Sequence, residues 1–158
     1  MSSNKAPRKS VARSRKEAEN VMTDIEPTTL LSQVQIITFD NSRPFSLEGR
    51  DILAKVMAIP DSNTIVLGFY LFRNRWTARC RHACFTCPDM HSSTPEIRAD
   101  GVKSHEMISN LLMDQVIRAS FGPNDKFGRA LVDITLGDER KLAHIMISSG
   151  FAAALPIA

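Results

Sequence analysis

The sequence predicts an α+β domain, because it contains five strand-like runs and two helix-like stretches in a chain of ordinary globular composition. The chain has 158 residues, 43% of them apolar, which is enough to bury one hydrophobic core. The predicted strands are 52–59, 64–72, 73–83, 116–120 and 129–136. The predicted helices are 101–114 and a second that begins at Gly137 and Asp138 and ends before Gly150.

Residues 1–28 are predicted to form a basic, disordered arm, since so polar a segment cannot bury enough apolar surface to offset its ordering entropy. The cations that precede its first acid, Glu17, are Lys5, Arg8, Lys9, Arg13, Arg15 and Lys16. Such an arm is typical of nucleic-acid contact or nuclear targeting, and a merely solvated tail is the alternative.

Residues 29–50 are predicted to be an extra strand followed by a linker. The apolar run 30–39 contains Val34, Ile36 and Ile37, which favours a strand, whereas 41–49 has the composition of a loop. The strand is either an added edge strand or an interaction element, and both interpretations stay open.

Each predicted helix has one apolar face. In the first helix that face consists of Met107, Ile108, Leu111 and Leu112. In the second it consists of Leu142, Ile145, Met146 and Ser149. Asp138 and Glu139 are expected in the first turn of the second helix, and Gly150 is the expected left-handed stop.

The third strand carries an unusual row of cations. Strand periodicity sends one set of side chains to one face, namely Arg73, Arg75, Thr77, Arg79 and Arg81. Trp76, Ala78 and Cys80 face the other way. Phosphate binding would explain a row of guanidinium groups, because their donors match phosphate oxygens. A solvated outer face is the alternative, and we favour it for Arg73 and Arg75.

The segment between the last two strands is predicted to be a tight turn, because it combines Pro123, Asn124, Asp125 and Gly128. Asp125 is expected to cap this turn rather than to bind metal. Lys126 either contacts a phosphate or solvates the loop, and Arg129 opens the following strand.

These motifs resemble the staphylococcal nuclease-like (thermonuclease) family. The resemblance rests on Gly122-Pro123, on Asp-Lys-Phe-Gly-Arg at 125–129, and on the strand and Gly-ended helix that follow. Upstream, 58–64 is similar to the family's Asp-Gly-Asp-Thr loop and 87–89 to its Thr-Pro-Glu. The resemblance implies a five-stranded OB-type β-barrel with two packed helices over 51–158, without the family's usual C-terminal helix.

The resemblance also implies catalytic positions. The family uses two arginines, a glutamate, and a calcium ion held by two aspartates. Arg81 and Arg129 fall on the arginines, and Asp89 falls on the glutamate but is one methylene shorter. Asn63 and Thr86 fall on the two aspartates, so the calcium carboxylates are missing. Asp61 could replace one of them if the loop register shifted, and Phe127 stands where the family has a tyrosine.

Cys80, Cys84 and Cys87 have the spacing of an iron–sulfur motif, and with His82 or His91 they could form a zinc site. Buried thiols that pack as small apolar groups are the interpretation we favour. His105 and His144 have no acid or nucleophile placed to form a dyad, so packing or surface roles are expected.

We therefore predict a degenerate nuclease-like domain that binds nucleic acid without cutting it and needs no cofactor. Its expected contacts are Arg79, Arg81, Lys126, Arg129 and the arm. Two alternatives stay open: a scaffold subunit of a larger protein assembly, and an active calcium-dependent nuclease. The polar N-terminus and three cysteines predict an intracellular protein, cytoplasmic or nuclear and not secreted, and no apolar run predicts a membrane span.

Overall fold

The computed structural model describes residues 27–156 and divides the chain into two units, 1–44 and 45–158. The six cations at the start of the arm lie outside the described residues. The predicted disorder of the arm and its predicted contacts with nucleic acid therefore stay predictions. None of the helices in the described part of the chain is long and apolar enough to cross a membrane.

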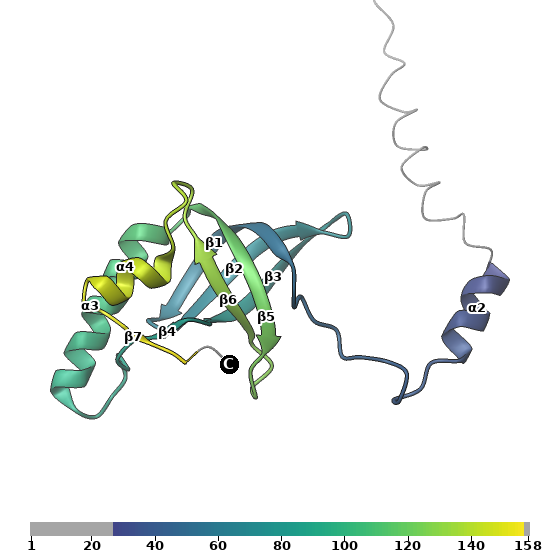
Figure 1. Cartoon of the computed structure of the whole chain (residues 1–158), viewed down its shortest axis with the longest axis horizontal. Helices are drawn as coiled ribbons and strands as arrows, with labels where there is room; N and C mark the ends of the chain where they lie inside the picture. Colours follow the sequence, from purple (N-terminus) through teal and green to yellow (C-terminus); the bar gives the residue numbers. More distant parts are fainter. Residues whose placement is uncertain (1–26, 157–158) are drawn as a thin grey trace, which may run out of the picture. The chain divides into compact units, whose positions relative to one another are not determined.

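The second unit is a closed five-stranded β-barrel of mixed strand direction, which is consistent with an α+β fold of the OB type (Figure 1). The strand order is β1-β2-β3-β6-β5, and every pair is antiparallel except β3 with β6. The bounds are Asp51–Asp61 (β1), Thr64–Leu71 (β2), Asn74–His82 (β3), Val116–Asn124 (β5) and Ala130–Thr135 (β6). The five predicted strands are therefore confirmed, with ends that differ by a few residues.

Alternating side chains of these strands fill the barrel. On β1, Ala54 and Val56 point inward and are buried, while Lys55 between them is exposed. Other fully buried side chains are Ile65, Leu67, Ile117, Val132 and Ile134. This apolar interior is the main source of stability, because each buried side chain of this size contributes about 1.5–3 kcal/mol.

Helix α3 covers Pro95–Leu112 and begins six residues earlier than predicted, with Pro95 in its first turn. Its buried positions Ser104, Ile108 and Leu112 recur every fourth residue, so one face packs on the barrel. Gly101 allows a close approach, because a Cβ there would lie 2.4 Å from the backbone nitrogen of Met90. The helix thereby fixes the loop that precedes it.

Helix α4 covers Leu142–Ser148, so our prediction that it begins at Gly137 and Asp138 was wrong. Residues 137–141 form a turn instead, with Glu139 left-handed at φ 69° and the Leu136 N–H donating to the Arg140 carbonyl. Leu142 and Met146 are buried as expected, but Ser149 is exposed. Gly150 has the predicted left-handed conformation, with φ 77°.

Two short strands that we did not predict join the chain's end to the loop after β3. They are β4, Phe85–Thr86, and β7, Ala153–Ala154, which pair antiparallel. Figure 1 shows this small sheet with α3 and α4 at one end of the barrel, and the β2–β3 hairpin at the other end.

The first unit contains helix α2, Pro27–Gln35, so the predicted strand over 30–39 was wrong. Leu30, Leu31 and Val34 are spaced for one side of a helix, and periodicity alone cannot separate a short buried strand from a short helix. All three side chains are at least half exposed. The predicted linker ends earlier than residue 50, because Leu47 is buried in the barrel unit.

Candidate nucleic-acid interface

Asn63 joins the two loops to which the resemblance assigns the calcium aspartates. Its side-chain Nδ2 donates to the Cys87 carbonyl at 3.0 Å, and its Oδ1 accepts from the Cys87 N–H at 2.7 Å. The same Oδ1 accepts from the Thr86 hydroxyl at 3.3 Å. Ser62 adds a hydrogen bond to the Pro88 carbonyl at 2.9 Å. The fold thus brings positions 63 and 86 together, and neutral hydrogen bonds connect them.

The carboxylates near these loops are engaged with backbone donors. Asp61 Oδ1 accepts from the Asn63 N–H at 2.8 Å, so this side chain closes the β1–β2 turn. Asp89 is exposed, and its Oδ1 accepts from the His91 N–H at 2.8 Å. The second oxygen of each carboxylate is not used in these bonds, but the backbone of its own loop fixes the orientation of each carboxylate.

A calcium ion does not fit this arrangement. Calcium needs several oxygen ligands with carboxylate charge among them. The Asn63 Oδ1 already accepts two hydrogen bonds, and the Thr86 hydroxyl donates to it. Within the described residues, no group of three or more His, Cys, Asp or Glu side chains could hold a metal ion.

Arg79 and Arg81 lie on β3 and point away from the barrel interior, because the alternate residues Cys80 and His82 are buried. The parallel register pairs Arg81 with Leu131 on β6, two residues after Arg129. Strand spacing and rise then put the Cα atoms of Arg81 and Arg129 roughly 8 Å apart, with Arg129 directly before the start of β6. Among the described residues, neither Arg79 nor Arg81 has an ion-pair partner.

Arg129 differs from the β3 arginines because it has a carboxylate partner. Its Nε donates to Asp125 Oδ2 at 2.8 Å, and both side chains are mostly buried. Asp125 Oδ1 also accepts the backbone N–H groups of Phe127 and Arg129, so Asp125 caps the turn as predicted. Burial acts to raise the pKa of Asp125, but these donors outweigh it and hold the pKa below its usual range. Among the described residues, the two terminal nitrogens of Arg129 have no hydrogen-bond partner of this kind.

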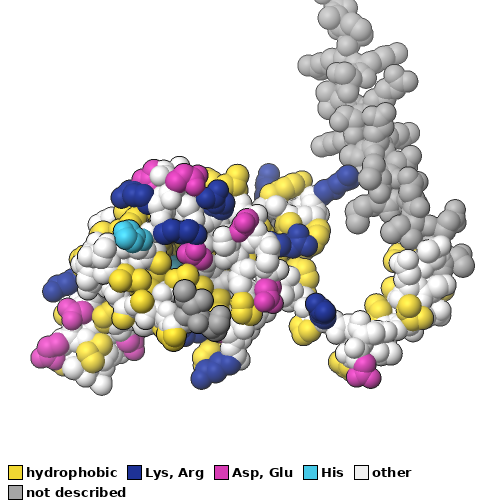
Figure 2. Space-filling model, in the orientation of Figure 1, with side chains coloured by type: hydrophobic (Ala, Val, Ile, Leu, Met, Phe, Trp, Pro, Cys, Tyr) yellow, Lys and Arg dark blue, Asp and Glu magenta, His cyan; other side chains and the backbone are white. Residues whose placement is uncertain are grey.

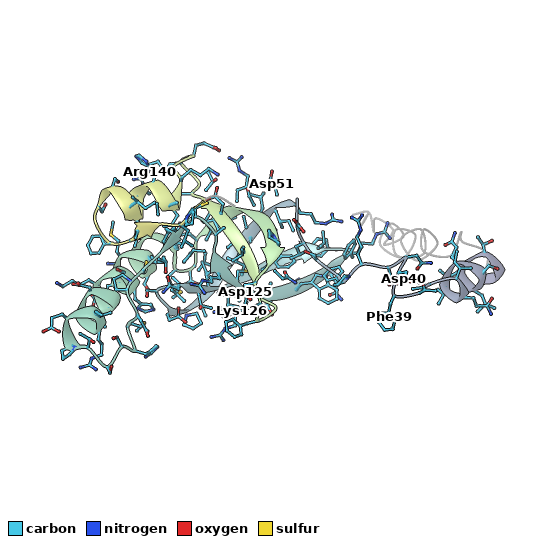
Figure 3. The ribbon with its side chains drawn as sticks, turned by 60° about the horizontal axis from the view of Figure 1, so that its bottom comes forward. Phe39, Asp40, Asp51, Asp125, Lys126 and Arg140 are labelled. Atoms are coloured by element: carbon cyan, nitrogen blue, oxygen red, sulfur yellow. The ribbon has the colours of Figure 1, made fainter. Side chains whose placement is uncertain are left out.

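The β5–β6 loop presents Asp125 and Lys126 together, as Figure 3 shows. Gly128 is left-handed at φ 77°, which lets the chain reverse. The exposed Phe127 ring lies 5.1 Å from Lys126 Nζ and 5.4 Å from the Arg129 guanidinium carbon. Phe127 therefore lies close to two cationic side chains.

His82 and the cysteines form no metal site in the described part of the chain. His82 is fully buried and stacks on Phe85 with ring centres 4.5 Å apart. Neither of its ring nitrogens has a hydrogen-bond partner among residues 27–156. Burial lowers the pKa of His82 to about 4, with Asp61 opposing and Arg81 adding to the shift. Burial also raises the pKa of Cys80 to about 12 and of Cys87 to about 11, so both thiols stay protonated at neutral pH.

The remaining predicted positions are structural or lie apart. His105 Nε2 contacts the Ile59 carbonyl at 2.7 Å, which ties α3 to β1, and His144 is exposed on α4. Sequence reasoning missed the bridging role of Asn63. It also missed an aromatic pocket around Trp76, although the chain's single tryptophan beside a turn without glycine was a signal.

The chain matches no protein-family model, and a search of curated proteins gave no significant match.

Proposed function

We propose that this protein is a degenerate member of the staphylococcal nuclease-like family that binds nucleic acid and does not hydrolyse it. The observation that carries the proposal is the pair Arg79 and Arg81, two outward guanidinium groups without a carboxylate partner among the described residues. Arg118, Arg129 and Arg140 each have such a partner. Unpaired, clustered cations repel one another, and phosphate oxygens would relieve that repulsion.

The loops around Asn63 support the proposed lack of hydrolysis. Phosphodiester cleavage in this family depends on a divalent cation to stabilise developing charge. Here the two ligand positions carry an amide and a hydroxyl that bond to each other. The arginines that would stabilise a reacting phosphate can still hold an unreactive one.

The test is a titration of the full chain with a labelled single-stranded oligonucleotide at several salt concentrations. We expect Arg81→Ala and Arg79→Ala each to weaken binding and to reduce the salt slope by about 0.7, the value for one phosphate on a single strand. Arg118→Ala is the matched control, because it removes the same charge from an arginine that pairs with Glu139 at 2.8 Å.

Equal losses in all three variants would mean that net charge, not the β3 site, holds nucleic acid. Calcium-dependent cleavage that both a chelator and Arg81→Ala abolish would establish the nuclease alternative instead. The same variants thus distinguish specific binding, diffuse attraction and catalysis.

A further inference from the structure

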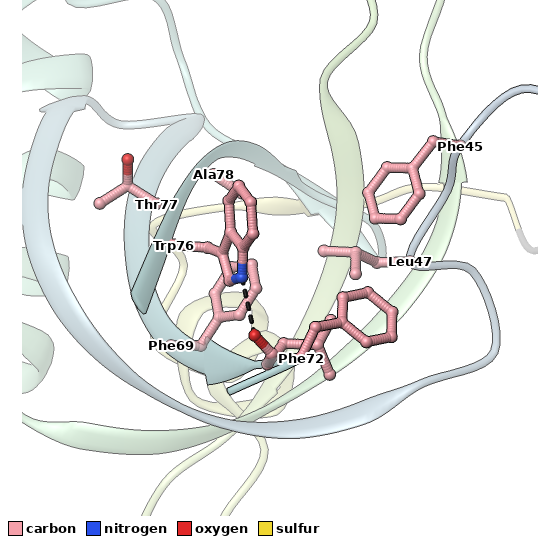
Figure 4. A pocket seen from close by; sticks show the side chains of 8 residues that line it. Phe45, Leu47, Phe69, Phe72, Trp76, Thr77 and Ala78 are labelled. Atoms are coloured by element: carbon pink, nitrogen blue, oxygen red, sulfur yellow. Dashed lines mark hydrogen bonds between the residues drawn. The ribbon is translucent and has the colours of Figure 1, made fainter. Parts of the chain in front are cut away.

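The end of the barrel opposite to Asn63 contains an apolar pocket of about 360 Å³ (Figure 4). We call it the aromatic pocket. Its lining residues are Phe45, Leu47, Phe69, Leu71, Phe72, Trp76, Thr77 and Ala78. β2 runs from Thr64, next to Asn63, to Leu71 in the pocket, so the pocket and the β3 arginine end are separate sites.

Large aromatic side chains are left exposed around this pocket. Phe45 is 75% exposed, Phe72 63% and Trp76 48%. Clustered exposed apolar surface of this kind marks a contact site for another molecule. Figure 2 shows hydrophobic side chains with Lys and Arg side chains among them at the hairpin end of the barrel.

The backbone at Phe72 is strained in a way that stability alone does not explain. Phe72 and Arg73 form the two-residue loop between paired Leu71 and Asn74, with φ values of 50° and 60°. Asn-Gly is the favoured pair at these left-handed positions, and a bulky residue there is an outlier. Such strain persists where the side chain serves a contact.

The small number of polar groups in the pocket lining determines which kind of ligand the pocket can bind. The indole N–H of Trp76 already donates to the Leu71 carbonyl at 2.8 Å, and Thr77 is the remaining polar side chain of the lining. A nucleobase would bury several edge donors and acceptors without partners, which is unfavourable for each group. An apolar side chain of a protein loses nothing of this kind on entering the pocket.

The rim supplies a charge. The guanidinium carbon of Arg50 lies 5.7 Å from the Phe72 ring centre. Arg50 has no ion-pair partner among the described residues, and the neighbouring Glu48 does not pair with it. A carboxylate next to the entering side chain would complement Arg50 at the edge of an apolar site, where water screens it less than at an open surface.

We infer that the aromatic pocket binds a partner protein through one apolar side chain flanked by a carboxylate. This inference does not rest on nucleic-acid binding, because none of the lining residues is a proposed phosphate contact. It gives the barrel two ligands of different chemistry at its two ends.

The test uses a blocked synthetic pentapeptide with one central phenylalanine between glutamates, and the emission of Trp76, the single tryptophan, as the signal. We expect a saturable change with a Kd below about 1 mM, near the weak limit of specific binding. Replacing the phenylalanine by alanine should abolish the change. Replacing the glutamates by lysines should weaken binding about tenfold.

Four variants test the location of the site. Ala78→Leu fills the pocket, Phe72→Asn removes the strained ring, and each should weaken peptide binding about tenfold or more. Arg79 directly follows Ala78 but does not line the pocket, so Arg79→Ala should leave peptide binding unchanged. Arg50→Ala should weaken binding of the glutamate peptide and should not weaken binding of the lysine peptide, because it removes a like charge from the latter.

Several outcomes would overturn the inference. One is no change in Trp76 emission at peptide concentrations up to about 1 mM. Another is peptide binding by Ala78→Leu and Phe72→Asn that is as strong as that of the wild type. Displacement of the peptide by a single-stranded oligonucleotide would assign the pocket to bases. A dimer in sedimentation that Ala78→Leu dissociates would assign it to a second copy of the chain.

Discussion

The two ends of the barrel differ in how their surface groups are satisfied. At the Asn63 end, loop backbone groups are bonded to side chains, and Asn63 alone makes three hydrogen bonds to the 86–87 segment. At the Trp76 end, the aromatic pocket leaves apolar rings in water and keeps a bulky residue at φ 50°. The first end is stabilised by its own hydrogen bonds, whereas the second keeps exposed rings and a strained backbone that the proposed peptide contact would cover. Arg79 and Arg81 lie on the half of β3 that is nearer to the Asn63 end, opposite Val66 and Thr64 of β2.

The largest expected effect is a pH dependence that originates at the Asn63 end. His82 has a pKa of about 4 in the folded chain and about 6.5 when unfolded, so the unfolded chain binds a proton first as pH falls. The free energy of unfolding should therefore fall by about 3 kcal/mol between pH 6.5 and pH 4. Urea unfolding over this range measures it.

His82→Leu is the control for that prediction, because it removes the imidazole and keeps a buried apolar group. The pKa of Asp125 is also lowered, so its contribution to stability is likewise lost as the pH falls, and this smaller loss remains in His82→Leu. If wild type and His82→Leu have the same pH slope, the imidazole is not the buried neutral group we describe.

Asn63→Ala should destabilise the fold by about 2 kcal/mol, because the N–H and carbonyl of Cys87 lose their side-chain partners. Thermal unfolding measures the change. Ser62→Ala is a milder comparison, since it removes one bond to the Pro88 carbonyl. A neutral Asn63→Ala would show that the two loops are held by packing and not by this amide.

Phe72→Asn should stabilise the fold by about 1 kcal/mol, because asparagine tolerates the left-handed conformation that phenylalanine resists. The melting temperature should rise while peptide binding is lost. Tyr70→Asn is a matched aromatic replacement on the preceding strand, and it should not be stabilising. A drop in melting temperature for Phe72→Asn would mean that the ring contributes to the fold and the two ends are less different than proposed.

Arg81→Ala should have the smallest effect on stability, below about 0.5 kcal/mol, since the guanidinium has no ion-pair partner among the described residues. Denaturant midpoints of the two proteins measure it. Combined with weaker oligonucleotide binding, an unchanged midpoint would separate function from stability at this residue. A loss above about 1 kcal/mol would make Arg81 a structural residue.

The strands and most of the cation row on β3 were predictable from the sequence, because side chains alternate along a strand and the pattern is local. Arg73 was wrongly included in that row, since it lies in the left-handed turn between Leu71 and Asn74. Arg79 and Arg81 fell on the outward side as expected, and Cys80 on the inward side. The cap at Asp125 was predictable for the same reason, since its partners are two and four residues away.

Long-range contacts decided the rest. The bridge from Asn63 to Cys87 spans 24 residues, and the pocket joins Phe45 to β3 from a segment whose sequence looks like a linker. The helix at 27–35 was missed because a short apolar run has the same composition in either secondary structure. Local residue patterns determine which side chains face outward, whereas barrel closure determines which of them meet, because it brings together residues whose separation along the chain carries no periodic signal.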